Sequence, residues 1–222
     1  MCLAGVSRST THELRITNDG ALEAMAIAAS GNRFGQCGDG RAEKRTATDV
    51  PRRVAGIADV VAAAAGGSAD AGHSLAVTRC GELFAWGCDR WQQLGLGSAS
   101  AGAVGYTWAG GKLWQTTPRR VPALADVVDV AAGDDHSLAL TRDGTVYAWG
   151  RGNDGQLGTK CFVGPPRPVA ALSRARGGSR RPVAVAARGA CSCALLDDGE
   201  VACVGACRRV RGALRDALLG GA

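Results

Sequence analysis

The chain has 222 residues, 46% of them hydrophobic and 33 of them glycine, so it can bury a sizeable core and make many tight turns. No run of about 18 uncharged apolar residues occurs and no secretory signal begins the sequence, so we expect no membrane span and a cytoplasmic or nuclear protein. A short organelle-targeting segment is the alternative, because Arg8 and Arg15 stand among serines and threonines. The nine cysteines are odd in number, which disfavours a disulfide framework and favours small buried side chains.

A repeat of about 60 residues runs through the sequence. His12 opens a first, degraded copy, HELRITNDGALEAM, which GNRFGQCG follows. The second and third copies align without gaps, as HSLAVTRCGELFAWGCDRWQQLG from His73 and HSLALTRDGTVYAWGRGNDGQLG from His136. The fourth copy, CSCALLDDGEVACVG, begins at Cys191, which stands in the place of the histidine. The intervals between these positions are 61, 63 and 55 residues, so the copies cover nearly the whole chain.

Each copy has the pattern of antiparallel β-structure. In the third copy, residues 127–133, 136–141 and 145–150 alternate in polarity or are rich in β-branched residues, which predicts three strands. An Asp-Gly pair ending at Gly144 predicts a type I′ hairpin turn, and Gly158 marks a further tight turn. One such unit cannot bury both of its faces alone, so the stacking of successive units predicts a propeller.

The pattern His-Ser-Leu-Ala-Leu-Thr-x-Asp-Gly-x-Val-Tyr-x-Trp-Gly-x-Gly-x-x-Gly-Gln-Leu-Gly resembles the repeat of the regulator of chromosome condensation family. The resemblance implies an all-β fold with one antiparallel blade per repeat. A closed propeller of this family normally has seven blades, whereas this chain offers about four, so a partial propeller is expected. A fragment or incorrectly predicted gene product, a propeller completed by a partner chain, and a short open array all fit. The expected repeats lie within residues 1–207, at about 2–49, 50–116, 117–164 and 165–207, before a basic tail, 208–222, with a helical stripe.

Three histidines share one repeat position, His12, His73 and His136, and two tryptophans share another, Trp86 and Trp149. A catalytic or metal site does not recur in every blade. We therefore interpret each histidine as hydrogen-bonding a turn inside its own blade, and the tryptophans as core residues between blades. Because no nucleophile–base pair, carboxylate pair or phosphate-binding loop is found, we predict no catalytic residue and no enzyme.

Four cysteines gather near the end of the fourth copy, in the pattern Cys191-x-Cys193-x9-Cys203-x3-Cys207. Four thiolates suit zinc in number, but the spacing lacks the paired Cys-x2-Cys knuckles of zinc sites. We therefore expect no metal and no cofactor.

Two features point to partners. Trp108 and Trp114 stand in an insertion at residues 101–117, where they are candidate partner-binding residues, with packing on the blade as the alternative. The net charge of +6 resides in residues 161–222, which hold ten arginines and four acidic residues. The basic residues between 174 and 215 predict contact with nucleic acid or an acidic protein surface, with a solvated loop as the alternative. Within this stretch, the candidate partner-binding residues are Arg174, Arg176, Arg180 and Arg181.

Repeats without catalytic residues predict a non-catalytic protein-interaction scaffold. The family resemblance implies a second function, guanine-nucleotide exchange on a Ran-like small GTPase in association with chromatin, although no motif matches the loop that would act on the nucleotide. The basic last quarter of the chain predicts a third function, direct nucleic-acid binding.

Overall fold

The computed structural model describes residues 5–27, 32–42, 50–68, 71–97, 106–109, 112–159, 163–173 and 180–207. These residues form sixteen strands and no helix, so no helix among them could cross a membrane. The predicted basic tail, 208–222, and its helical stripe lie outside the described residues. The strands are β1 (Val6–Arg8), β2 (His12–Ile16), β3 (Leu22–Ala26), β4 (Arg52–Arg53), β5 (Val60–Ser68), β6 (Ala71–Thr78), β7 (Leu83–Cys88), β8 (Tyr106–Ala109), β9 (Lys112–Arg120), β10 (Val127–Ala132), β11 (His136–Thr141), β12 (Val146–Arg151), β13 (Val163–Pro168), β14 (Pro182–Arg188), β15 (Cys191–Leu196) and β16 (Val201–Gly205).

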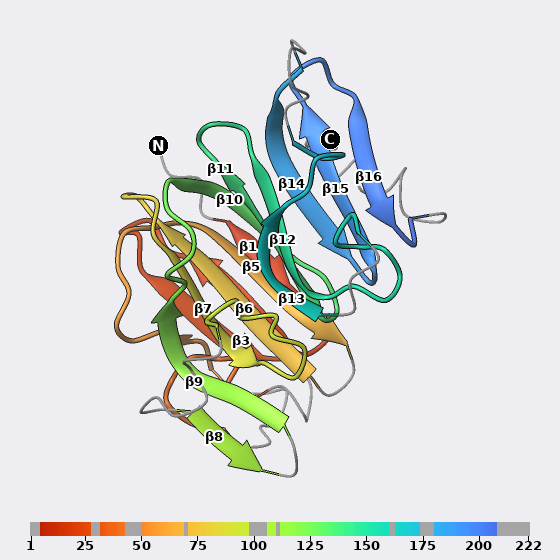
Figure 1. The fold of residues 1–222 in the computed structure, drawn as a ribbon. Helices are drawn as coiled ribbons and strands as arrows, with labels where there is room; N and C mark the ends of the chain where they lie inside the picture. Colours follow the sequence, from red (N-terminus) through yellow and green to blue (C-terminus); the bar gives the residue numbers. More distant parts are fainter. Residues whose placement is uncertain are drawn as a thin grey trace.

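The strands form four antiparallel sheets, each a blade (Figure 1). The strand orders are β1-β2-β3-β4, β5-β6-β7-β9-β8, β10-β11-β12-β13 and β14-β15-β16. The innermost strands pack in succession, β1 on β5, β5 on β10 and β10 on β14, so the blades fan around one axis. The predicted all-β propeller of about four blades is therefore confirmed.

The outermost strand of a blade comes from the segment that follows the glycine-rich loop. The short strand β4 pairs with β3, and β13 pairs with β12, so the Pro-Arg-Arg segment at residues 51–53 completes the first blade. In the second blade the insertion adds a hairpin, in which β8 extends the sheet beyond β9. The sheets therefore cross the repeat boundaries drawn at residues 49, 116 and 164.

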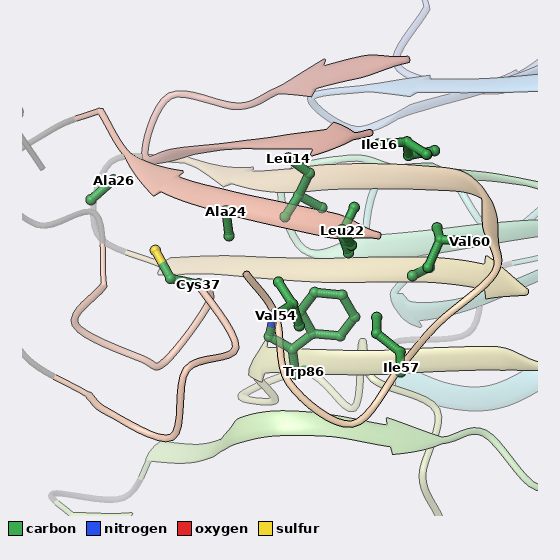
Figure 2. Close-up of a cluster of buried hydrophobic side chains, with 12 residues drawn as sticks. Leu14, Ile16, Leu22, Ala24, Ala26, Cys37, Val54, Ile57, Val60 and Trp86 are labelled. Carbon is green, nitrogen blue, oxygen red and sulfur yellow. The ribbon is translucent and has the colours of Figure 1, made fainter. Parts of the chain in front are cut away.

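Apolar side chains fill the space between successive blades. Between the first two blades, Leu14 and Leu22 pack with Val60 and Trp86, as Figure 2 shows. Trp149 occupies the corresponding place between the second and third blades, and both tryptophan side chains are fully buried. Because alternate residues of a strand point to opposite faces, each inner blade buries one face against its predecessor and one against its successor.

The hairpin turns of the four blades share one geometry, which differs from the predicted type I′ turn. In the third blade the Gly144 N–H donates to the Thr141 carbonyl at 2.9 Å, and the Thr141 N–H donates to the Thr145 carbonyl at 3.0 Å. Of these turn residues only Gly144 has a positive φ, +87°, whereas a type I′ turn needs two. The turn is thus a type I turn followed by a glycine bulge, and Asp143 accepts the hydroxyl hydrogen bond of Thr141 at 2.6 Å.

Replacing Gly144 by alanine tests this turn. An L-residue in the left-handed region costs about 1–2 kcal/mol, so Gly144→Ala should lower the free energy of unfolding by about that amount. Arg142→Ala, an exposed position of the same turn, is the matched control and should change it by less than about 0.5 kcal/mol. Urea unfolding followed by circular dichroism measures both, and equal stabilities would contradict the assigned turn.

Candidate functional site

A four-group hydrogen-bond cluster joins each blade to the next, and we call it the inter-blade node. Between the second and third blades, His73 Nε2 lies 3.0 Å from Ser137 Oγ. Ser137 Oγ donates to the main-chain carbonyl of Gln93 at 2.7 Å, and Trp149 Nε1 donates to the same oxygen at 2.8 Å. The imidazole therefore comes from one blade, and the hydroxyl and the indole come from the next.

The geometry fixes where the protons lie. The hydroxyl has one proton, and the Gln93 carbonyl accepts it, so the serine oxygen must accept the Nε2–H of His73. The carbonyl oxygen has two lone pairs, and the hydroxyl and the indole N–H use both. His73 thus carries a proton on Nε2, and because its Nδ1 is buried with no hydrogen-bond partner among the described residues, the imidazole is neutral.

The same node occurs at the other two junctions. His12 lies 2.7 Å from Ser74 Oγ, which donates to the Gln36 carbonyl together with Trp86 Nε1. At the last junction the corresponding atoms belong to His136, Ser192 and Gln156, and Val204 stands where the tryptophan would be. The adjacent histidine and serine of one repeat thus serve two junctions. The histidine contacts the following blade, and the serine contacts the preceding one.

Local sequence places the carbonyl of the node. The Gln93 side chain folds back and accepts the Trp91 N–H at 2.8 Å, and Gln36 and Gln156 make the same bond in their loops. The glycine after the tryptophan brings the strand close: at Gly150, φ is +98° and a Cβ would lie 2.6 Å from the Asp135 carbonyl oxygen. The Gly-Gln pair and the Trp-Gly pair of the repeat therefore both serve to build the inter-blade node.

The node corrects the interpretation of the histidines as caps within their own blades. Each Nε2 reaches the next blade, and only His12 also contacts hydroxyls of its own blade, Ser9 and Thr11, through Nδ1. Burial lowers the pKa of His12 and of His73 to about 3 and that of His136 to about 4. Neutral and fully buried, the three imidazoles hold blades together.

The candidate tryptophans lie on the extra hairpin of the second blade. Trp108 is in β8 and pairs through its backbone with Leu113, and Trp114 is in β9. The Trp114 ring is partly buried and makes an edge-to-face contact with Phe34 of the first blade, with centroids 5.8 Å apart. Trp114 thus packs on the neighbouring blade, which was the alternative to an interface role.

The candidate arginines divide into two groups. Arg174 and Arg176 lie outside the described residues. Arg180 is exposed and forms ion pairs with Asp198 at 2.8 Å and Glu200 at 3.2 Å, and Arg181 donates to the carbonyl of Arg142. Two acidic groups therefore offset the positive charge of Arg180, whereas most of the other arginines between 174 and 215 lie outside the described residues.

One exposed aromatic position was not singled out from the sequence. Trp91, in the loop of residues 89–94 that we call the Trp91 loop, is partly exposed between two guanidinium groups. Arg90 lies 5.4 Å and Arg151 lies 5.2 Å from the ring centroid, within cation–π range, and Arg151 also pairs with Asp135 at 3.3 Å. Arg151 belongs to the third blade, so this cluster spans two blades, and a single repeat could not reveal it.

A cavity of about 530 Å³ lies among the inner strands. All four blades contribute to its wall, through residues 7–10, 63–67, 130–134 and 186–189. Its charged lining side chains are Arg8, Asp134 and Arg188. Partial burial and the neighbouring Asp135 raise the pKa of Asp134. The cavity marks the propeller axis.

The cysteines of the last blade correct a further expectation. Disulfides join Cys191 to Cys207 and Cys193 to Cys203, although the sequence disfavoured a disulfide framework. The pairing follows from strand register, because Cys193 lies directly opposite Cys203 in the β15–β16 ladder. Parity and spacing in the sequence carry no information on that register.

The repeat geometry has a counterpart among known proteins. A model of the regulator of chromosome condensation (RCC1) repeat matches residues 80–140 and 143–195, just over half of the chain, and a second model of this repeat matches residues 127–156. The chain belongs to the RCC1-repeat family. The resemblance drawn from the sequence is thus confirmed.

Two curated relatives show how far the likeness extends. The RCC1 domain-containing protein RUG3, mitochondrial, of Arabidopsis thaliana is 30% identical over 204 residues, which are 90% of this chain and 41% of RUG3. The E3 ubiquitin-protein ligase HERC2 of Homo sapiens is 32% identical over 201 residues, 88% of this chain and 4% of HERC2. This RCC1-repeat chain therefore spans less than half the length of these relatives.

Solved structures share the fold. Prp20p of Saccharomyces cerevisiae superposes with a TM-score of 0.66 at 20% identity, over 98% of this chain and 47% of Prp20p. Human WBSCR16 superposes with a TM-score of 0.64 at 25% identity, over 90% of this chain and 46% of that protein. These likenesses identify the blades as RCC1-type propeller blades.

Truncating a node tryptophan should weaken a whole junction. Trp149→Ala removes a fully buried ring and one of the two donors to the Gln93 carbonyl, so it should cost about 3–5 kcal/mol of unfolding free energy. Trp91→Ala, which lies outside the node and is partly exposed, is the control and should cost clearly less. A thermal melt of Trp149→Ala indistinguishable from that of Trp91→Ala would contradict the node.

Acid should destabilise the junctions through the histidines. The pKa of His73 is about 3 when folded and about 6.5 when unfolded, so below pH 6.5 the unfolded chain binds the proton first. Each such histidine then costs about 1.4 kcal/mol of unfolding free energy per pH unit, down to its folded pKa. Burial raises the pKa of Asp89 to about 7 and of Asp129 to about 6, which opposes this slope over part of the same range.

A variant isolates one histidine from these opposing groups. His73→Gln offers an N–H to the serine oxygen but cannot titrate, so its unfolding free energy should fall less steeply between pH 6.5 and 5 than that of the wild type. The expected difference is one proton, about 2 kcal/mol over this range. Denaturant unfolding at several pH values measures it, and parallel curves would show that His73 does not stay neutral in the fold.

Proposed function

We propose that the chain is a non-catalytic protein-interaction module that binds its partner through the Trp91 loop. The observation that carries the proposal is the contrast between repeated and unrepeated residues. The repeated histidines and tryptophans are buried in the nodes, whereas Trp91 stays partly exposed across two blades and its counterpart in the first blade, Phe34, is buried. Tryptophan and arginine are the residue types most enriched in binding hot spots.

Backbone strain supports the Trp91 loop as the recognition element. Gln92 has φ +58°, in the left-handed region, where the other repeats place Gly35 at +72° and Gly155 at +80°. A non-glycine residue there costs of order 1–3 kcal/mol, and such strain concentrates at functional sites. The second repeat therefore has a strained backbone residue, Gln92, directly after a partly exposed aromatic side chain, Trp91.

The chemistry of the loop favours an acidic protein segment as partner. Arg90 and Arg151 lie on the indole, and Arg151 is paired with Asp135, so Arg90 supplies the positive charge beside the ring. A carboxylate could pair with Arg90 while an apolar side chain packs on the ring. Prp20p, which shares the fold, was studied for its binding to Gsp1p and histones, which supports protein as the class of partner.

Fewer observations support the two alternative functions, nucleotide exchange and nucleic-acid binding. Guanine-nucleotide exchange on a small GTPase draws on the fold likeness to Prp20p, without an element of this chain assigned to the nucleotide. Nucleic-acid binding draws on the basic last quarter, in which Arg180 is neutralised by Asp198 and Glu200. The same experiment distinguishes both from the proposal.

Affinity capture with the tagged full chain tests the proposal. Wild type, Trp91→Ala and Trp114→Ala are compared on native extract, with and without EDTA, after circular dichroism has shown that each variant is folded. Loss of a hot-spot tryptophan costs about 2 kcal/mol or more, so Trp91→Ala should weaken specific binding about 30-fold. Trp114→Ala should bind like the wild type.

Other results point elsewhere. Loss of binding in Trp114→Ala alone would move the site to the β8–β9 hairpin. A GTPase captured only with EDTA would establish exchange as the function, because EDTA removes magnesium and empties such proteins of nucleotide. Binding of short DNA with a steep salt dependence would favour the nucleic-acid alternative. Partners retained equally by all variants would refute the Trp91 loop as the site.

A further inference from the structure

The last blade carries cysteines at the positions that join earlier blades to their successors. In the third blade these positions hold His136, Leu138, Ala148 and Gly152. The register of β15 and β16 aligns them with Cys191, Cys193, Cys203 and Cys207. In the third blade this face packs on the fourth blade, whereas the part of the chain that the structure describes places no further sheet against the same face of the fourth. The cysteines thus occupy the face where the next inter-blade node would form.

The four thiol groups converge on one point. All four Sγ atoms lie within 4.8 Å of one another, and those of Cys191 and Cys193 are 3.6 Å apart. Cys191, Cys193 and Cys207 are buried in a small cluster that also includes Ala186 and Val201. No carboxylate or imidazole belongs to this ligand set, so the donors are sulfur alone.

The spacing of the sulfur atoms suits a tetrahedral metal. With zinc–sulfur bonds of about 2.3 Å, four sulfurs around one zinc ion lie about 3.8 Å apart. The present separations range from bonded pairs to 4.8 Å, so they bracket this value. Zinc binding would require the sulfur–sulfur bonds to open and the cysteine side chains to rotate. Two ligands come from one strand, one from the strand opposite and one from the segment beyond it, which is why no Cys-x2-Cys knuckle was needed.

We propose that the reduced protein binds one zinc ion through Cys191, Cys193, Cys203 and Cys207, on the face of the fourth blade that corresponds to the node face of the third. Each disulfide is first reduced by a dithiol, which gives up two electrons and two protons and becomes a disulfide itself. The four thiols then release four protons as zinc binds. An all-thiolate, buried and fully coordinated site is of the structural kind, and soft thiolate donors select zinc over magnesium or calcium. The site is independent of the Trp91 loop.

Metal titration of the full chain tests the proposal. The protein is reduced with dithiothreitol, freed of it without oxygen, and given zinc or cobalt as the probe. Wild type should retain one metal ion per chain after gel filtration, with the intense visible bands of tetrahedral cobalt thiolate. Its melting temperature should rise on zinc addition, because a ligand that binds only the folded state stabilises it.

Matched cysteine variants locate the metal. Cys80→Ser removes an exposed cysteine outside the cluster and should bind zinc like the wild type. Cys193→Ser and Cys203→Ser each remove one ligand and should lose stoichiometric zinc and the cobalt bands. Zinc uptake unchanged in both would assign the metal to other cysteines and overturn the proposal. A reduced, folded wild type that binds neither metal would overturn it without reference to any variant that fails to fold.

Discussion

At each junction between the described blades the structure depends on one main-chain carbonyl that accepts a serine hydroxyl, and at the first two junctions this carbonyl also accepts a tryptophan indole N–H. The oxygen of Gln93 receives the hydroxyl of Ser137 and the indole N–H of Trp149, both from the following blade. The hydroxyl proton is committed to that oxygen, so the serine can only accept from the histidine. One carbonyl thereby orders three side chains from two blades, and it keeps the imidazole neutral in a site where a charge would be costly.

This arrangement separates the residues that build the propeller from those free to recognise a partner. Histidine and tryptophan are common in active sites and interfaces, yet here the Nε2 atoms of the repeated histidines and the Nε1 atoms of the repeated tryptophans are directed into the nodes. The remaining candidates are residues that break the repeat. Trp91 and Gln92 do so at adjacent positions, one by exposing an indole and the other by placing a side chain where the other repeats need glycine. A rigid scaffold with one irregular loop is the usual form of a recognition surface.

The sequence was sufficient for what repeats within one blade and insufficient for what crosses between blades. Periodicity and the family pattern predicted the strands, the buried tryptophans and the number of sheets. The partner of each histidine could not be predicted, because the Ser137 hydroxyl lies 64 residues along the chain from His73 and shares a repeat position with neither the histidine nor the carbonyl. The hairpin turn was missed for a local reason, since Asp-Gly suits a type I′ turn and a type I turn with a glycine bulge alike.

The cysteines of the fourth repeat are a second case in which the sequence alone could not predict the contacts. Read along the chain, their spacing matches neither a zinc knuckle nor an even disulfide framework. Read across the ladder, Cys193 faces Cys203, and the segment after Gly205 returns Cys207 to Cys191. A node takes its serine from the following blade, and the described residues place no such blade against the fourth, so this face requires polar atoms that satisfy one another. Sulfur atoms that pair with one another, or share a metal ion, meet this requirement, whereas a buried histidine with no serine opposite would leave an unsatisfied N–H.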